Sequence, residues 1–232
     1  MNTLQLISAG AAQALVTRLQ ERVLALYGYA IGPTFGAVGL MKDKLLAGAP
    51  CDVLILTNAL IEQLTSSGHL AAGTAQALGV VKTGIAVKTG EARPAVGTRA
   101  ELTTALQAAS GIYFPDAVKS TAGIHFMNVL KQLGLDQELA DRLRTYPNGA
   151  AAMTAMAKSA EKGLIGCTQD TEILYIEGVD LIADLPKEFE LATVYTAAVC
   201  SKAKEPKGAA DLIALLAGSE TATLRIECGF EG

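Results

Sequence analysis

The sequence predicts an α/β protein of two lobes, in which each lobe is a mostly parallel β-sheet flanked by helices. Short apolar runs of strand length alternate with amphipathic helical segments along most of the chain, as in consecutive βαβ units. Two strand-like runs, Val80–Val87 and Thr193–Val199, stand outside this alternation, and we interpret them as crossovers between the lobes. Half of the 232 residues are hydrophobic, so the chain is able to bury a sizeable core.

The first part of the chain contains three strand–helix units. The third strand is a near-continuous apolar run, which is typical of a central parallel strand. The predicted strands are Leu4–Ser8, Ile31–Phe35 and Asp52–Leu56. Three helices are predicted between and after these strands. The first ends near Gly28 and carries Leu15, Leu19, Val23 and Leu26 on one face. The second covers Leu40–Ala47, and the third runs from Thr57 or Asn58 to Leu64.

The middle of the chain repeats the alternation. Thr98 and Glu101 form a capping box that predicts a helix start, and Phe126, Val129, Leu130 and Leu133 keep helical spacing after Gly123. The remaining predicted strands are Gly111–Phe114, Leu164–Thr168 and Val179–Ile182. The remaining predicted helices are Asp136–Leu143, Ala150–Ala160, the short Thr171–Tyr175, and two closing helices with Leu212, Ile213, Leu215 and Leu216 in one and Leu224 and Ile226 in the other.

Composition excludes several classes of partner. The net charge is −4, with 19 basic and 23 acidic residues and no basic cluster, so we expect no nucleic-acid partner. No apolar run reaches the roughly 20 residues that cross a bilayer, so we expect no membrane insertion. Four scattered cysteines and two histidines give no metal-ligand spacing, so we predict no metal site and no cofactor. We expect the cysteines to be buried hydrophobes of a reduced, intracellular protein.

The stretch Lys119–Gly123 is a candidate anion-binding site. It leads directly into a helix, and the first N–H groups of a helix have no internal partner and carry partial positive charge. Ser120 and Thr121 add two hydroxyls, although such residues also serve as ordinary helix caps. Ligands of parallel sheets gather beyond the carboxyl ends of strands, which adds Ser8–Gly10, Phe35–Gly39 and Thr57–Asn58 to the candidates.

Several segments, in order and spacing, resemble the solute-binding proteins of molybdate-type ABC transporters. These segments are Leu4–Ala11, Phe35–Leu56, Pro115–Leu133, Ile165–Ile173, Val194–Val199, Lys204–Pro206 and Gly229-Phe230. The resemblance implies the type II periplasmic-binding fold, with residues 1–82 and 197–232 in lobe I, residues 83–196 in lobe II, and an anion held in a cleft between them.

The resemblance also implies a set of ligand-binding residues, all of them neutral donors or backbone amides. They are Ser8, Ala9, Gly10, Gly36, Ala37, Ser120, Thr121, Ala122, Asn148, Gly149, Thr168, Gln169 and Tyr195. Hydroxyls, amides and helix N-termini of this kind solvate negative charge without a cation. The implied partners are a small anionic ligand and, for an exported protein, an ABC permease.

The chain departs from the family pattern in two ways. The loop Gly36–Gly39 has no hydroxyl where the family usually places one, and the residues before Leu4 show no signal peptide. We therefore expect a cytoplasmic protein, or a periplasmic one if a signal peptide was removed. We also expect a small organic anion, a carboxylate or polycarboxylate, in preference to molybdate or tungstate, which remain one alternative.

A second alternative is an enzyme, because some proteins similar to this family isomerise unsaturated tricarboxylates such as aconitate. His125 and Glu172 are then the catalytic candidates for proton transfer, although a packed helical histidine and a helix-capping glutamate are the commoner roles. Arg142 and Arg144 are candidates for neutralising a polycarboxylate, against the commoner role of solvated charge. A third alternative is the effector domain of a transcription regulator of similar fold. The absence of a helix-turn-helix segment counts against it.

Overall fold

The computed structural model describes residues 2–232, which divide into two compact units. Unit 1 comprises the chain up to Val81 together with Thr193–Gly232, and unit 2 comprises Lys82–Ala192. The second boundary lies four residues before the predicted one at 196/197. It moves because Tyr195 pairs with Thr57 and Thr196 with Leu56 inside the sheet of unit 1.

Unit 1 is built on a sheet of strand order β2-β1-β3-β9. Its strands are β1 Asn2–Ala9, β2 Tyr29–Gly36, β3 Val53–Thr57 and β9 Ala192–Val199. The first three are parallel to one another and β9 is antiparallel to β3, so the sheet is mixed rather than simply parallel. Every residue of β3 except Thr57 is buried, which fits the apolar run of a central strand.

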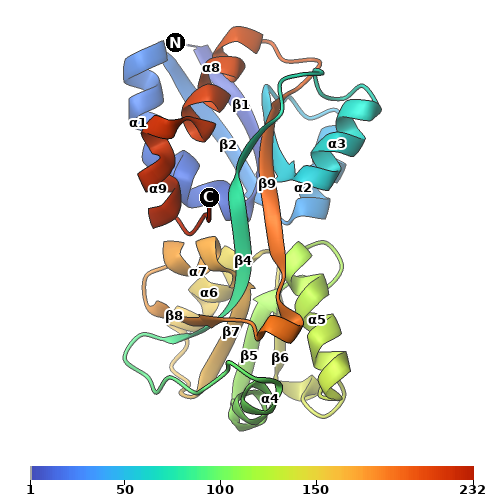
Figure 1. Cartoon of the computed structure of the whole chain (residues 1–232), viewed down its shortest axis with the longest axis vertical. Helices are drawn as coiled ribbons and strands as arrows, with labels where there is room; N and C mark the ends of the chain where they lie inside the picture. The colour runs from blue at the N-terminus through green and yellow to red at the C-terminus, as the bar shows by residue number, and fades with distance from the viewer. Residues whose placement is uncertain (1) are drawn as a thin grey trace. The chain divides into compact units, whose positions relative to one another are not determined.

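The helices of unit 1 cover both faces of this sheet. They are α1 Gln13–Tyr27, α2 Val38–Leu46, α3 Asn58–Ser66, α8 Pro206–Ala217 and α9 Ala222–Glu227. Figure 1 shows α8 and α9 beside α1, and α2 and α3 together elsewhere in the unit. Leu15, Leu19 and Val23 are buried as predicted, whereas Leu26 is 55% exposed. Leu26 lies in the last turn of α1, just before Gly28 ends the helix in the left-handed conformation.

Unit 2 has a second mixed sheet, of strand order β4-β7-β5-β6 with β8 paired to β4. Its strands are β4 Gln76–Lys88, β5 Gly111–Pro115, β6 Leu143–Tyr146, β7 Leu164–Gln169 and β8 Val179–Asp184. The strands β5, β6 and β7 are parallel, and β4 runs antiparallel to β7 and β8. The chain crosses from unit 1 to unit 2 within β4 and returns at the start of β9.

Four helices complete unit 2. They are α4 Arg99–Ala108, α5 Thr121–Leu133, α6 Gly149–Lys158 and α7 Asp170–Tyr175. The predicted capping box at the start of α4 is confirmed, with Thr98 and Glu101 bonding each other's backbone N–H groups. Figure 1 shows α5 on one side of β5 and β7, and α6 and α7 on the other.

The predicted helix Asp136–Leu143 is wrong. The segment contains only turns and a 3₁₀ turn at Ala140–Arg142, and the chain then enters strand β6, which the sequence analysis missed. Leu135 and Leu139 are both buried at a spacing of four residues, which imitates the spacing of a helix face. The prediction failed because β6 is short and has no buried residue.

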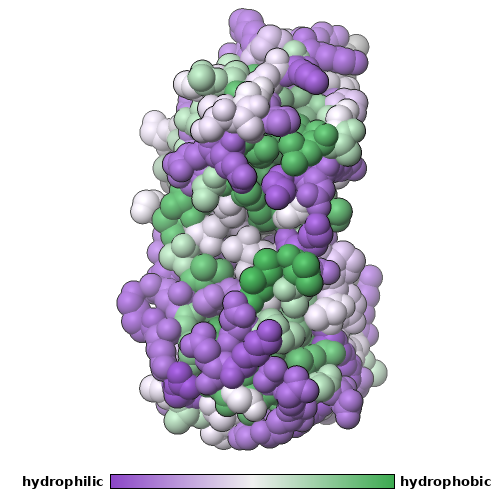
Figure 2. Space-filling view, turned by 90° about the vertical axis from the view of Figure 1, so that its right-hand side faces the viewer, coloured by the Kyte–Doolittle hydropathy of each residue, from purple (hydrophilic) through white to green (hydrophobic). Residues whose placement is uncertain are grey.

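Each unit has its own hydrophobic core. One cluster fills unit 1, and two clusters in unit 2 lie beneath α4 and α5 and beneath α6 and α7. All four cysteines are buried and free, as expected of small hydrophobic core residues. Figure 2 shows hydrophobic side chains dispersed among hydrophilic ones on the face in view. Ile226, which was predicted to lie in the second closing helix, is in α9 and is 66% exposed.

Candidate anion-binding site

The predicted ligand residues of unit 1 lie at the carboxyl edge of its parallel strands. Ser8 and Ala9 end β1, and the register pairs Ala9 with Gly36 at the end of β2. In the neighbouring strand pair β3–β9, Tyr195 pairs with Thr57 at the end of β3. The Ser8 side chain is completely buried, and its hydroxyl donates to the carbonyl of Ala9 at 2.8 Å. The strand register therefore brings the predicted residues of this unit to one edge.

Two helices of unit 1 start at the same edge without a side-chain cap. The 3₁₀ turn Gly10–Ala12 follows Ala9 directly, and Ala37 is the N-cap of α2. Neither start has a side-chain oxygen bound to its backbone N–H groups. Because the first N–H groups of a helix have no intrahelical partner, these starts present amide donors at the edge.

In unit 2, the loop from β5 to α5 is folded around Asp116. One oxygen of its carboxylate accepts hydrogen bonds from the N–H groups of Val118 and Lys119, each at 2.7 Å. The Ser120 N–H donates to the Asp116 carbonyl at 3.1 Å. Asp116 is not among the predicted site residues, although an aspartate that bonds the N–H two residues later is a known turn former. Asp116 therefore sets the position in which α5 begins.

A close approach between α5 and the end of β5 explains Gly123. A Cβ atom at this position would collide with the carbonyl oxygens of Pro115 and Asp116. Only glycine allows the first turn of α5 to lie directly on the end of the strand. The start of the helix is thereby held against the carboxyl edge of the sheet.

The hydroxyls at the start of α5 do not cap the helix. Ser120 is the N-cap residue and is only 7% exposed, but its side chain makes no cap hydrogen bond. Within residues 2–232, neither its hydroxyl nor that of Thr121 has a hydrogen-bond partner. The first helical amide bond runs from the Ile124 N–H to the Ser120 carbonyl, so the N–H groups of Thr121 and Ala122 precede the helical ladder. This start offers hydroxyl and amide donors together.

The start of α6 is different, because the protein's own side chains occupy it. Asn148 is the N-cap, and its side-chain oxygen accepts from the Ala151 N–H at 2.8 Å. The carboxylate of Glu172 lies against Gly149, where a Cβ atom would collide with it. Burial raises the pKa of Glu172, and hydrogen bonds from Thr168 and from the backbone of Ala150, Gly149 and Gln169 oppose that rise.

Buried polar side chains continue from β7 into α7. Thr168 donates to Glu172 at 2.6 Å, and the Gln169 amide nitrogen donates to the Thr83 hydroxyl at 3.3 Å. The Gln169 oxygen and the Thr171 hydroxyl are buried without a partner among residues 2–232. The structure therefore places the predicted Thr168 and Gln169 at the carboxyl edge of unit 2, where both bond to neighbouring side chains.

The other predicted polar residues of unit 2 make internal bonds. The Nε2–H of His125 donates to the Phe189 carbonyl at 2.7 Å, because a carbonyl is able only to accept. Arg142 donates to the carbonyls of Gln107 and Ala109 at the end of α4. Arg144 forms a two-fold ion pair with Glu161 and donates to the Tyr113 hydroxyl, and these hydrogen bonds raise its pKa. These contacts stabilise unit 2 locally.

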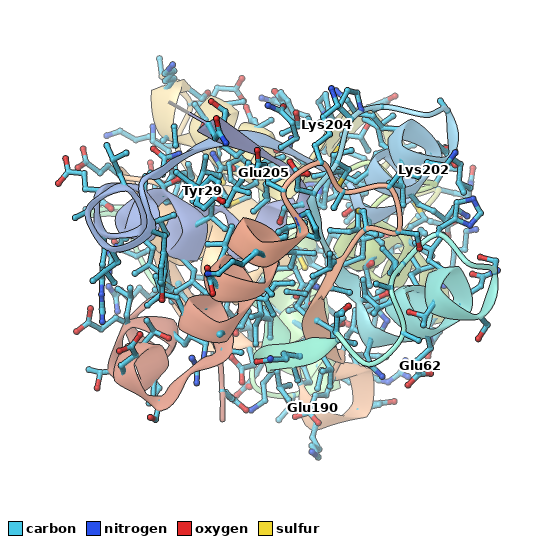
Figure 3. All side chains as sticks on the ribbon, turned by 90° about the horizontal axis from the view of Figure 1, so that it is seen from above. Tyr29, Glu62, Glu190, Lys202, Lys204 and Glu205 are labelled. Carbon is cyan, nitrogen blue, oxygen red and sulfur yellow. The ribbon has the colours of Figure 1, made fainter. Side chains whose placement is uncertain are left out.

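A polar cavity lies at the opposite, amino edge of the sheet of unit 1. It has a volume of about 530 Å³ and is lined by Asn2, Thr3, Gln5, Pro50, Asp52, Lys204 and Glu205. The buried Asp52 carboxylate accepts N–H groups of Gln5, Lys204 and Glu205 at 2.7, 2.7 and 3.1 Å. Figure 3 shows Tyr29 near Glu205, to which its hydroxyl donates at 3.3 Å. Asp52 thus ties the loop after β9 to β1.

Among residues 2–232, no group of three or more histidine, cysteine, aspartate and glutamate side chains is arranged to hold a metal ion. No helix in the same part of the chain is long and apolar enough to cross a bilayer.

Comparison with known proteins places this geometry in a family. The chain is 25% identical over 183 residues to an aconitate isomerase from a Pseudomonas species, covering 78% of this chain and 68% of that protein. It superposes on the periplasmic molybdate-binding protein of Azotobacter vinelandii with a TM-score of 0.81 and 17% identity, over 99% of both chains.

A substrate-binding domain assigned to a molybdenum ABC transporter of Clostridium difficile gives a TM-score of 0.70 at 16% identity, over 100% of this chain and 99% of that one. At these identities the two structures establish the fold alone, and it is the fold that the sequence resemblance implied. The family model of bacterial extracellular solute-binding proteins matches residues 4–231, and the chain therefore belongs to this family.

Proposed function

We propose that this solute-binding protein holds a small organic anion, a carboxylate or polycarboxylate, at the start of α5 in unit 2. The observation that carries the proposal is the pair of hydroxyls of Ser120 and Thr121, which have no partner within residues 2–232 and stand beside the first N–H groups of α5. A carboxylate accepts hydrogen bonds through two oxygens, and it gains from the positive end of the helix.

The preference for an organic anion rests on the donors that are missing from unit 1. The loop Gly36–Gly39 has no hydroxyl, so this part of the predicted site has only backbone donors. The Ser8 hydroxyl already donates to Ala9. A compact tetrahedral oxyanion such as molybdate needs several fixed donors around it, whereas a larger anion is able to use fewer donors spread over a longer molecule.

A thermal-shift screen tests this proposal. The protein is mixed with cis-aconitate, trans-aconitate, citrate, sulfate, molybdate and tungstate at equal ionic strength, and bound ligand raises the melting temperature by mass action. We expect a saturable increase with a polycarboxylate, a loss of it in Ser120→Ala and Thr121→Val, and its retention in Asn128→Ala, an exposed position of α5. A response to molybdate or tungstate alone would contradict the organic-anion assignment.

A second candidate function is isomerisation of an unsaturated tricarboxylate. The likeness to the aconitate isomerase, at 25% identity over 78% of the chain, favours this candidate specifically. Such an enzyme moves a proton between carbons while donors hold the carboxylates. Proton–deuterium exchange into cis- or trans-aconitate, followed by NMR in D₂O, separates the two functions. Exchange above the rate without protein supports the isomerase, and its absence together with tight binding supports a binding protein.

In the binding-protein case, an ABC permease is the partner to which such a protein delivers its ligand, and this partner is part of the proposal. Neither function requires a cofactor, since the donors considered are all side chains and backbone groups of the chain.

A further inference from the structure

The starts of α5 and α6 are both at the carboxyl edge of unit 2, yet only the start of α6 is occupied by a carboxylate of the protein itself. At α5, the hydroxyls of Ser120 and Thr121 have no partner among residues 2–232. At α6, a buried carboxylate of the protein itself lies where a bound anion is expected. The difference between the two starts is therefore the presence of Glu172.

The position of Glu172 matches that of a helix-bound anion. It is only 5% exposed, it accepts from the Thr168 hydroxyl at 2.6 Å, and the backbone of Gly149 and Ala150 at the start of α6 bonds to it. The absence of a side chain at Gly149 is what lets the carboxylate come so close. Two backbone amides, a hydroxyl and a helix N-terminus are the same kinds of donor that bind carboxylates and phosphates in other proteins.

Glu172 also belongs to the start of a second helix. It is the third residue of α7, and it bonds back to the backbone of Gln169, the N-cap residue. A glutamate three residues after the N-cap commonly satisfies the N-cap N–H in this way. One carboxylate therefore satisfies amide groups at the starts of both α6 and α7.

We infer that Glu172 is a permanent internal ligand of α6 that closes this helix start to external anions, so that a ligand of unit 2 is recognised at α5 alone. The inference deepens the proposed function, and only its second half, the recognition of an external ligand at α5 alone, rests on that function. The first half, that the carboxylate fills an anion site, holds whether or not the protein binds an external anion. Asn148 and Gly149 then serve the internal carboxylate and the helix cap, and make no contact with a ligand.

The inference predicts that a small carboxylate replaces the missing side chain in Glu172→Ala. Removing the carboxylate leaves the amides of Gly149 and Ala150 and the Thr168 hydroxyl buried without an acceptor, so the melting temperature falls by several degrees. Formate or acetate should restore part of the loss with a saturating dose dependence, whereas chloride at the same ionic strength should not. Wild type and Glu177→Ala, which removes an exposed glutamate, should respond equally to formate and chloride.

Two results would overturn the inference. The first is a Glu172→Ala protein that keeps the wild-type melting temperature, and the second is a Glu172→Ala protein whose melting temperature responds equally to formate and chloride. A measurement on wild type covers the case in which the variant does not fold. The amide protons of Gly149, Ala150 and Gln169 should follow one common pH titration, with the midpoint of the Glu172 carboxyl carbon, and Thr168→Val should move that midpoint upward because it removes a hydrogen bond that lowers the pKa. Amide protons that titrate with midpoints different from that of the Glu172 carboxyl carbon would also refute the inference.

The outcomes separate this inference from the proposed function. Rescue by formate and the common titration need no external ligand, so they stand if no polycarboxylate binds. If a polycarboxylate binds but the amides of Gly149 and Ala150 shift along with those of α5, the proposed function stands and the assignment of Glu172 fails.

Discussion

Gly123→Ala tests whether the start of α5 is held against the end of β5. Alanine favours a helix interior over glycine by about 1 kcal/mol, so propensity alone predicts a more stable protein. The added Cβ atom collides with the carbonyl oxygens of Pro115 and Asp116, which are backbone atoms and have no rotamer to change. Over-packing of this kind costs about 1–3 kcal/mol, so the net effect is a loss of up to about 2 kcal/mol.

Urea denaturation measures this loss, and a melting curve should show a decrease of up to about 8 °C. The polycarboxylate affinity should fall as well, because the added Cβ atom pushes the start of α5 away from β5 and so displaces the donors of Ser120 and Thr121. The control is Ile124→Ala, since Ile124 is the next residue and is 42% exposed, so its change should stay within about 0.5 kcal/mol. A Gly123→Ala protein that is more stable than wild type and binds normally would refute the close approach.

Three further predictions concern caps, charge and thiols. Asn148→Ala should lose about 1 kcal/mol in urea denaturation, because the Ala151 N–H loses its acceptor, and a loss below about 0.3 kcal/mol would contradict this cap. Hydrogen bonds from Thr89 and Arg93 lower the pKa of Asp180, so their stabilising effect is present above its unfolded pKa and is lost as the pH falls through the folded pKa. Arg93→Gln should therefore raise the pKa of Asp180 in a carbon-NMR titration, and an unchanged midpoint would exclude the ion pair. All four cysteines are buried, so Ellman's reagent should react with them at an ordinary rate only after unfolding in guanidinium chloride.

Much of the fold is encoded locally and is therefore visible in the sequence. The apolar run of β3, the capping box at Thr98 and the glycine that ends α1 each depend on neighbouring residues, and the structure has all three. Strand β6 was missed because it is short and partly exposed, and Leu135 and Leu139 before it imitate a helix face. The overall alternation of strands and helices nevertheless sufficed to predict the fold class, which the family match confirms.

The candidate site is encoded less locally. Strand ends and helix starts are visible in the sequence, which is why the residues at both carboxyl edges were predicted. The sequence does not show which donors are already occupied. Asn148 and Ser120 are both N-cap residues, yet only Asn148 caps its helix with its side chain. The contact of Glu172 with Gly149 joins two helices that are separated by strand β7, so it depends on tertiary packing.

An amide NMR titration of the wild-type protein with trans-aconitate tests the central claim most directly. The amide signals of Thr121 and Ala122 should shift saturably with ligand concentration, because their N–H groups are the donors proposed for the anion. Those of Gly149 and Ala150 should remain in place, because Glu172 occupies them. A saturable response that leaves Thr121 and Ala122 unchanged, or no response to any polycarboxylate, would contradict the account of an anion bound at the start of α5.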